Sequence, residues 1–126
     1  LSDYKGKKLV VFFYPKASTP GCTVEACDLR DNYHRFLAQG YEVLGVSADD
    51  SKRQTNFKEK NKLPFDLIAD TDRKVIEAFG VWGEKKFMGR TYDGIHRTTF
   101  IIDQNGIIID VIEKVKTKEH TKQILD

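Results

Sequence analysis

The chain has few cysteines and no long apolar run. Its two cysteines among 126 residues, Cys22 and Cys27, are too few for the disulfide framework of a small secreted domain. We therefore expect a reducing, cytoplasmic location. No apolar run approaches the roughly 20 residues of a membrane-spanning helix, and the sequence shows no signal peptide. We expect no membrane as a partner.

An excess of charge of one sign is also lacking. The 21 Lys and Arg residues and the 19 Asp and Glu residues leave a formal net charge of +2, and the lysines are scattered among acidic residues. Such a balance gives no strong preference for nucleic acid, which is therefore not an expected partner.

The chain has no internal repeat and no low-complexity tract, and its 126 residues are enough for one hydrophobic core. We expect a single domain over residues 1–126. Because the chain starts at Leu1 rather than at a methionine, we expect that its ends are truncated.

Apolar runs typical of buried strands alternate with helical patterns. Strands are predicted at residues 9–14, 41–47, 63–69, 98–103 and 107–112, and helices from residue 20 to near 40, at 52–61, at 70–79 and after 117. Asn105-Gly106 between the last two apolar runs is a strong hairpin signal. Residues 81–94 are expected to be irregular. The order predicts an α/β domain with a central mixed sheet flanked by helices, compatible with a thioredoxin-like fold.

Both cysteines lie where a predicted strand leads through a short loop into a helix. Thr19-Pro20 is typical of an N-cap residue followed by proline at the first helical position, which makes Cys22 the third helical residue. The free N–H groups and the dipole of a helix start favour negative charge. Cys22 should therefore be partly thiolate, the reactive form, at neutral pH. The Thr19 hydroxyl should lie close to the Cys22 sulfur, because N-cap and third residues face each other.

Helical spacing predicts a stripe of residues that faces the core, and Cys27 lies off this stripe. The stripe consists of Cys22, Ala26, Leu29, Tyr33, Phe36 and Leu37. Residues five apart in an intact helix have Cα atoms roughly 8–9 Å apart, whereas a disulfide needs less than about 7 Å. Cys22 and Cys27 could therefore bond only if the first turns of the helix unwound.

The pattern Pro15-x-x-x-Thr19-x-x-Cys22 resembles the active-site signature of peroxiredoxins. The fuller string from Tyr14 to Cys27 resembles the peroxiredoxin Q subfamily, also called bacterioferritin comigratory protein. Residues 80–86 and 94–103 are similar to later landmarks of that subfamily, so the resemblance covers nearly the whole chain. It implies a thioredoxin-like fold and a short upstream segment that this sequence lacks.

The resemblance also implies a function: a thioredoxin-dependent thiol peroxidase that reduces hydrogen peroxide and organic hydroperoxides without a cofactor. Cys22 corresponds to the peroxidatic cysteine, whose thiolate attacks the peroxide and becomes a sulfenic acid. Cys27 corresponds to the resolving cysteine, which would form an intramolecular disulfide after local unwinding. Thioredoxin or a similar dithiol protein would reduce that disulfide by exchange.

Other residues are candidates for binding the peroxide. The leaving oxygen develops negative charge, so donors must point at it. The Thr19 hydroxyl and the backbone N–H groups of Gly21 and Cys22 are available at the helix start. Arg97 matches the active-site arginine of the family and supplies several donors with a fixed positive charge. Pro15 has no N–H and can shield the sulfur from water.

Several assignments stay open. Trp82 is a candidate for lining the substrate pocket, although ordinary packing explains it equally well. Glu25 could orient the arginine or could favour the helix start through the dipole, and the sequence does not separate these roles. We expect a monomer or a weak dimer.

Three other interpretations fit the sequence less well. A zinc site made of Cys22, Cys27 and His34 lacks a second Cys or His pair nearby, so we expect no bound metal. A thioredoxin-like thiol–disulfide oxidoreductase would place its cysteines as Cys-x-x-Cys, a shorter spacing than here. A non-enzymatic binding module on the same fold would require an exposed client surface, for which the sequence gives no sign.

Overall fold

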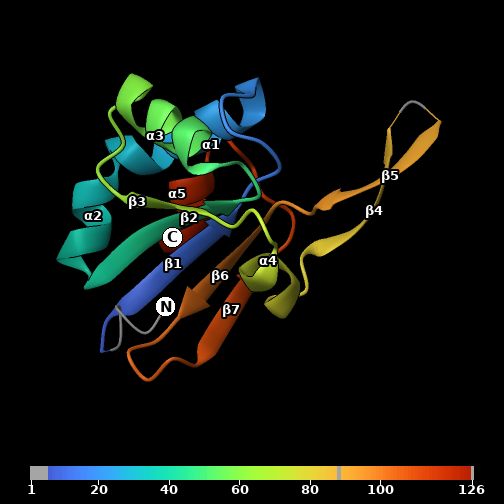
Figure 1. Ribbon diagram of the computed structural model, residues 1–126. Coiled ribbons are helices and arrows are strands. Elements are labelled where there is room, and N and C mark those ends of the chain that lie inside the picture. The colour runs from blue at the N-terminus through green and yellow to red at the C-terminus, as the bar shows by residue number, and fades with distance from the viewer. Residues whose placement is uncertain (1–5, 88, 126) are drawn as a thin grey trace.

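A five-stranded mixed sheet forms the centre of the molecule (Figure 1). A computed structural model describes residues 6–87 and 89–125 of the chain. The strand order is β3-β2-β1-β6-β7. The strands are β1 (Lys8–Phe13), β2 (Tyr41–Ser47), β3 (Asp66–Ala69), β6 (Thr98–Ile102) and β7 (Ile108–Ile112). β1, β2 and β3 pair in parallel, whereas β6 pairs antiparallel with both β1 and β7. The predicted mixed sheet and the predicted hairpin are confirmed.

Helices cover both faces of the sheet. They are α1 (Pro20–Asp31), α2 (Tyr33–Ala38), α3 (Ser51–Lys60), α4 (Lys74–Ala78) and α5 (His120–Leu125). Residues of α1, α2, α3 and α5 pack on one face, and those of α4 pack on the other. The predicted α/β architecture is therefore confirmed. Because both faces are covered, β1 buries side chains that point either way, and its sequence is continuously apolar rather than alternating.

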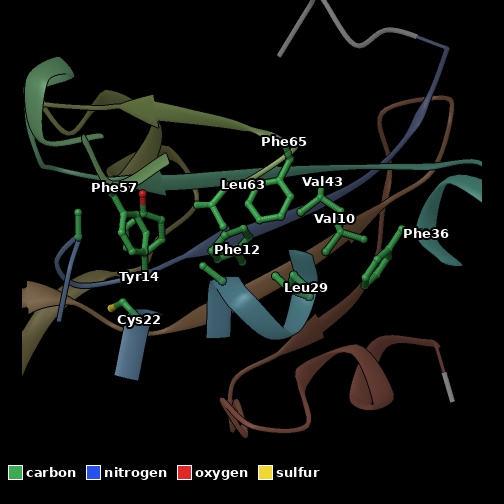
Figure 2. Close-up of a cluster of buried hydrophobic side chains, with 12 residues drawn as sticks. Val10, Phe12, Tyr14, Cys22, Leu29, Phe36, Val43, Phe57, Leu63 and Phe65 are labelled. Carbon is green, nitrogen blue, oxygen red and sulfur yellow. The ribbon is translucent and has the colours of Figure 1, made fainter. Parts of the chain in front are cut away.

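Cys22 belongs to the core on the α1 side. Val10, Phe12 and Tyr14 project from β1 into this cluster, and Figure 2 draws Cys22 beside Tyr14 at one end of it. Leu9, Val11 and Phe13 point to the opposite cluster, beneath α4. The thiol thus sits at the point where the buried strand passes into the first helix.

The long helix predicted from residue 20 to near 40 is wrong in one respect, because it is broken at Asn32. This residue leaves the helical conformation with φ −113° and ψ 12°, and its side-chain Nδ2 donates to the Asp28 carbonyl at 2.8 Å. Because of this break, the spacing of core-facing residues in α1 does not continue into α2. Phe36 is still buried, but Leu37 is 50% exposed and does not belong to the core stripe.

The prediction that residues 81–94 are irregular is also wrong. They form an antiparallel ribbon of β4 (Trp82–Phe87) and β5 (Arg90–Ile95), which projects from the body of the molecule (Figure 1). The ribbon buries neither face for most of its length, so its sequence has no apolar alternation to reveal it. At its base, the Arg73 guanidinium lies 4.3 Å from the Trp82 ring.

The predicted helix at 70–79 is shorter than expected. Asp70 lies before the helix, and its carboxylate accepts a hydrogen bond from the Ile76 N–H at 2.7 Å. Arg73 takes a left-handed conformation with φ 60°, which delays the helix to Lys74. Similarly, the strand predicted at 63–69 is restricted to Asp66–Ala69.

The centre of the sheet requires glycine at position 45. A Cβ atom there would lie 2.6 Å from Leu67 Cδ2 and 2.8 Å from Phe12 Cζ. We expect Gly45→Ala to lower the free energy of unfolding by about 1–3 kcal/mol through overpacking, measured by urea denaturation. The matched control is Gly94→Ala on the ribbon, where the new Cβ meets Lys85 Cδ at 3.2 Å; it should change stability by less than about 0.5 kcal/mol. Equal unfolding midpoints for the two variants would contradict this account.

Candidate active site

The loop before α1 is attached to the end of the neighbouring strand. The Tyr14 N–H donates to the Val46 carbonyl at 3.1 Å, and the Ala17 N–H donates to Asp49 Oδ2 at 2.7 Å. The same carboxylate oxygen accepts the Ser47 hydroxyl at 2.7 Å. These bonds hold the start of α1 at the carboxyl ends of β1 and β2, the edge at which open α/β sheets commonly place their ligands.

Thr19 is the N-cap residue of α1, as predicted, and Pro20 follows at the first helical position. Within the described chain, however, the Thr19 side chain makes no capping hydrogen bond. Its hydroxyl donates to the Lys16 carbonyl at 2.8 Å instead. Since a hydroxyl has one proton, Thr19 Oγ1 is left as a hydrogen-bond acceptor toward a ligand.

Cys22 is in direct contact with the predicted arginine. Arg97 Nη2 donates to Cys22 Sγ at 3.3 Å, and Arg97 Nη1 donates to Glu25 Oε1 at 2.7 Å. A Cβ atom on Gly21 would lie 3.3 Å from Arg97 Nη2, so glycine at this position leaves room for the guanidinium. Arg97, more than 70 positions away in sequence from both Cys22 and Glu25, thereby joins them in one cluster.

The position of Glu25 distinguishes between its two possible roles. It lies three residues after Cys22, on the same side of the helix, and its side chain is 0% exposed. Its carboxylate orients Arg97 toward the thiol, which is the first of the two roles considered. Burial raises the pKa of Glu25 to about 7, although the Arg97 charge opposes the shift.

Arg97 carries its charge in a half-buried position. Burial disfavours the guanidinium cation, but the Cys22 thiolate and the Glu25 carboxylate outweigh this cost and raise the pKa of Arg97 above its ordinary value. A permanent cation 3.3 Å from a sulfur favours the thiolate form of that sulfur.

A buried phenol lies behind the cysteine loop. The Tyr14 hydroxyl donates to Gln54 Oε1, and Gln54 Nε2 donates to the Ile68 carbonyl at 2.8 Å. Burial raises the pKa of Tyr14 well above its ordinary value, so this side chain stays neutral beside Cys22. Gln54 could not be recognised from the sequence, because a glutamine on a polar helix gives no signal of a buried partner.

Cys27 lies apart from the cluster around Cys22. Helix α1 is intact from Pro20 to Asp31, and both cysteines are free thiols. Cys22 is buried, whereas Cys27 is half-buried and its Sγ lies 3.8 Å from Asn61 Oδ1. Arg30 Nη1 donates to the Asn61 carbonyl at 2.8 Å on the same side of the helix.

The remaining predicted residues occupy different places. Pro15 is partly buried in the loop between β1 and α1. Trp82 packs against the core cluster on the α4 side of the sheet, with Arg73 over its ring. Arg97 borders a cleft of about 820 Å³. Besides Arg97, the polar residues lining this cleft are Lys85, His96, Thr98, Glu113 and Lys114.

His120 is a further buried residue that the sequence did not reveal. His120 is fully buried, and its Nε2 lies 3.5 Å from Glu25 Oε2. No local pattern could reveal this contact, because 94 residues separate the two positions and only the docking of α5 against α1 brings them together.

Within residues 6–87 and 89–125, no three His, Cys, Asp or Glu side chains gather as metal ligands. No described helix has the length and apolar character to cross a membrane.

The chain matches known proteins over nearly its whole length. Residues 1–111 match the profile of the AhpC/TSA family. The chain is 51% identical over 126 residues to Peroxiredoxin Bcp of Escherichia coli strain K12, covering 100% of this chain and 81% of that protein. It is 50% identical over 125 residues to Peroxiredoxin Bcp of Bacillus subtilis strain 168, covering 99% and 80%.

A solved structure of a bacterioferritin comigratory protein has the same fold as this chain. The bacterioferritin comigratory protein of Xanthomonas campestris, described for its alkyl peroxide reduction activity, superposes with a TM-score of 0.92 at 38% identity. The match covers 99% of this chain and 80% of that chain. The expected thioredoxin-like fold is therefore confirmed.

The contact between Arg97 and Cys22 predicts a measurable change in thiol reactivity. In a Cys27→Ser background, Arg97→Ala should slow the alkylation of Cys22 at pH 7 by about tenfold or more, because an opposite charge in contact with the sulfur is lost. The measurement is the rate of iodoacetamide labelling at pH 7.

The matched control for this variant is Arg53→Ala. Arg53 is an exposed arginine that pairs with Asp49 at 3.7 Å near the same loop, so its removal should leave the labelling rate of Cys22 unchanged. An equal loss of labelling rate in both variants would assign the effect to net charge rather than to the contact with sulfur.

Proposed function

The chain belongs to the AhpC/TSA family and is a peroxiredoxin of the Bcp/PrxQ type, a thiol peroxidase, and on this premise we propose that Cys22 is the residue that attacks the peroxide. The observation that carries the assignment is the hydrogen bond from Arg97 Nη2 to Cys22 Sγ at 3.3 Å. Cys22 also occupies the third position of α1, where helix N–H groups favour an anion.

The proposed first step transfers one oxygen atom to Cys22. The thiolate attacks the terminal oxygen of a hydroperoxide, a sulfur–oxygen bond forms and the oxygen–oxygen bond breaks. Cys22 becomes a sulfenic acid, and the leaving alkoxide or hydroxide takes up a proton to give an alcohol or water. Arg97 stabilises the charge first on the sulfur and then on the leaving oxygen.

The loop and the helix start would orient the substrate. Because the Thr19 hydroxyl donates to the Lys16 carbonyl, we assign Thr19 Oγ1 as the acceptor of the hydroperoxide O–H. This differs from the donor role that the sequence suggested. The N–H groups of Gly21 and Cys22, in the first turn of the helix, are the donors available to the peroxide oxygens. Pro15 excludes water from the sulfur.

The proposed second step uses Cys27. Its thiolate attacks the sulfur of the Cys22 sulfenic acid, a sulfur–sulfur bond forms and the sulfur–oxygen bond breaks. The leaving hydroxide takes up a proton to give water. Residues five apart in an intact helix have Cα atoms roughly 8–9 Å apart, beyond disulfide geometry. The first turns of α1 must therefore unwind, and Cys22 must leave the core.

The remaining partners follow from this cycle. We propose that thioredoxin or a similar dithiol protein reduces the disulfide by exchange, and that the substrates are hydrogen peroxide and organic hydroperoxides. A cytoplasmic location suits a cycle that depends on a dithiol reductant. Trp82 stays a prediction as a substrate contact, and the monomer or weak dimer stays a prediction for the assembly.

Intact mass after oxidation tests the two-step cycle. The reduced protein treated with one equivalent of hydrogen peroxide should lose the mass of two hydrogens, with a peptide that links Cys22 to Cys27. Cys27→Ser should instead gain one oxygen on Cys22, and Cys22→Ser should stay unchanged. A gain of oxygen on Cys22 of the unmodified chain would remove Cys27 as the resolving residue. Peroxide consumption by Cys22→Ser would overturn the assignment of the nucleophile.

A further inference from the structure

Asp49 is a largely buried carboxylate that contacts the loop leading to Cys22. Its side chain is 6% exposed. Oδ2 accepts the Ala17 N–H at 2.7 Å and the Ser47 hydroxyl at 2.7 Å. Oδ1 lies 3.7 Å from Nη1 of Arg53, whose own side chain is 60% exposed. Burial of a carboxylate is unfavourable unless hydrogen bonds compensate for it, and the two short bonds to Oδ2 provide that compensation.

The pair of Ser47 and Asp49 fixes the direction of this carboxylate. The Ser47 hydroxyl donates to Asp49 Oδ2, and the Asp49 N–H donates back to Ser47 Oγ at 3.2 Å. Ser47 is fully buried as the last residue of β2. The pair therefore holds Oδ2 at the end of the central sheet. The bond to Ala17, 32 positions away in sequence, attaches the loop to that fixed point.

The peptide group between Lys16 and Ala17 connects Asp49 to Thr19. Its N–H, which belongs to Ala17, donates to Asp49 Oδ2 at 2.7 Å. Its carbonyl, which belongs to Lys16, accepts the Thr19 hydroxyl at 2.8 Å. Because a peptide group is planar and rigid, the direction of its N–H also fixes the direction of its carbonyl. The Asp49 carboxylate therefore determines which atom the Thr19 hydroxyl meets.

The residue between these two contacts has an unfavourable backbone conformation. Ser18 has φ 65°, in the left-handed region that residues other than glycine rarely adopt. Such a conformation persists only where the surrounding structure holds it. On one side of Ser18, the Ala17 N–H is bonded to Asp49. On the other side, the Thr19 carbonyl accepts the Thr23 N–H of α1 at 2.9 Å.

We propose that Asp49 is a positioning residue that orients the Thr19 hydroxyl toward the peroxide. The inference rests on the proposed roles of Cys22 and Thr19. A carboxylate has only acceptors, so the peptide group after Lys16 must present its N–H to Asp49 and its carbonyl to Thr19. The single proton of the Thr19 hydroxyl is then used, and Oγ1 keeps its lone pairs for the O–H of a hydroperoxide. Each bond of this chain also polarises the next one.

The interactions that favour the Cys22 thiolate do not include this chain of hydrogen bonds. Arg97 donates to the sulfur and to Glu25, and neither residue belongs to the loop. Oxidation by a peroxide needs the substrate to be aligned with the sulfur, whereas alkylation by iodoacetamide does not use the Thr19 acceptor. Loss of Asp49 should therefore slow the first reaction and spare the second.

Replacement of Asp49 tests this separation in a Cys27→Ser background. Asp49→Ala should slow the oxidation of Cys22 by hydrogen peroxide about 10- to 100-fold, because the group that orients the substrate is misplaced. The rate of iodoacetamide labelling at pH 7 should change by less than about twofold, because the contact with Arg97 remains. Both rates are measured by intact mass after timed quenching. An unchanged oxidation rate, or an equal loss in both reactions, would overturn the proposal.

Two further variants distinguish the hydrogen bond from the charge and from the turn. Asp49→Asn keeps an oxygen that can accept the Ala17 N–H and should recover most of the lost oxidation rate; no recovery would contradict the proposed chain. The matched control is Asp50→Ala, which removes an exposed carboxylate that caps α3 by accepting the Arg53 N–H at 2.8 Å. It should leave both rates unchanged.

A double-variant cycle tests whether Asp49 acts through Thr19. Thr19→Val removes Oγ1, so Asp49→Ala should slow oxidation by less than about twofold more in that background. A further loss as large as in the chain with Thr19 would mean that Asp49 acts by another route, and the proposal would be wrong.

Hydrogen exchange of the Ala17 amide provides a test that does not depend on the folding of a variant. In the reduced, unmodified protein this amide should exchange at least about tenfold more slowly than in an unstructured peptide, because it is bonded to a largely buried carboxylate. Exchange at the unstructured rate would overturn the proposal. Failure of the proposed function has a different signature, namely peroxide consumption that survives Cys22→Ser. If Cys22 is required but the Asp49 variants or this amide disagree, only the role of Asp49 is wrong.

Discussion

The contact between the Arg97 guanidinium and the Cys22 sulfur is the interaction on which the rest of the site depends. It places a cation against a thiol that is 1% exposed, where a negative charge on the sulfur without a partner would be unfavourable. Glu25 holds the other side of the guanidinium, and Gly21 leaves it the room to approach. The peroxidase chemistry proposed here uses this one arrangement twice, for the thiolate and for the leaving oxygen.

In the proposed cycle, the same helix serves two opposed requirements. For the proposed attack, the first turn of α1 must be formed, so that Cys22 faces Arg97 from the end of the core. For the proposed resolution, the turn must open to bring Cys22 to Cys27. Two stabilising features common at helix starts are missing here. The described chain provides no side-chain cap from Thr19, and the first turn contains no acidic residue. The burial of Cys22 and its bond to Arg97 oppose the opening, and oxidation of the sulfur changes both.

Most of the fold could be predicted from the sequence, because strands that are buried on both faces of a sheet have continuously apolar sequences. Continuous apolar runs revealed β1 and β2, and Asn105-Gly106 revealed the turn between β6 and β7. The predictions of secondary structure were wrong where the sequence has no such apolar pattern. The ribbon of β4 and β5 has little buried face, and the break at Asn32 depends on one side-chain hydrogen bond to the Asp28 carbonyl.

The sequence by itself determined the family, the two cysteines at the start of a helix and the candidate partner Arg97, since these lie in contiguous motifs with a local chemical meaning. Only the tertiary structure decided which atoms meet. It gave Glu25 its role as the orienting carboxylate, turned the Thr19 hydroxyl toward Lys16, and brought His120 of α5 to within 3.5 Å of the Glu25 carboxylate. The physical reason is that ionisation and hydrogen bonding in a buried cluster depend on atoms within about 4 Å, and these come from α1, α5 and the start of β6, which are distant in sequence.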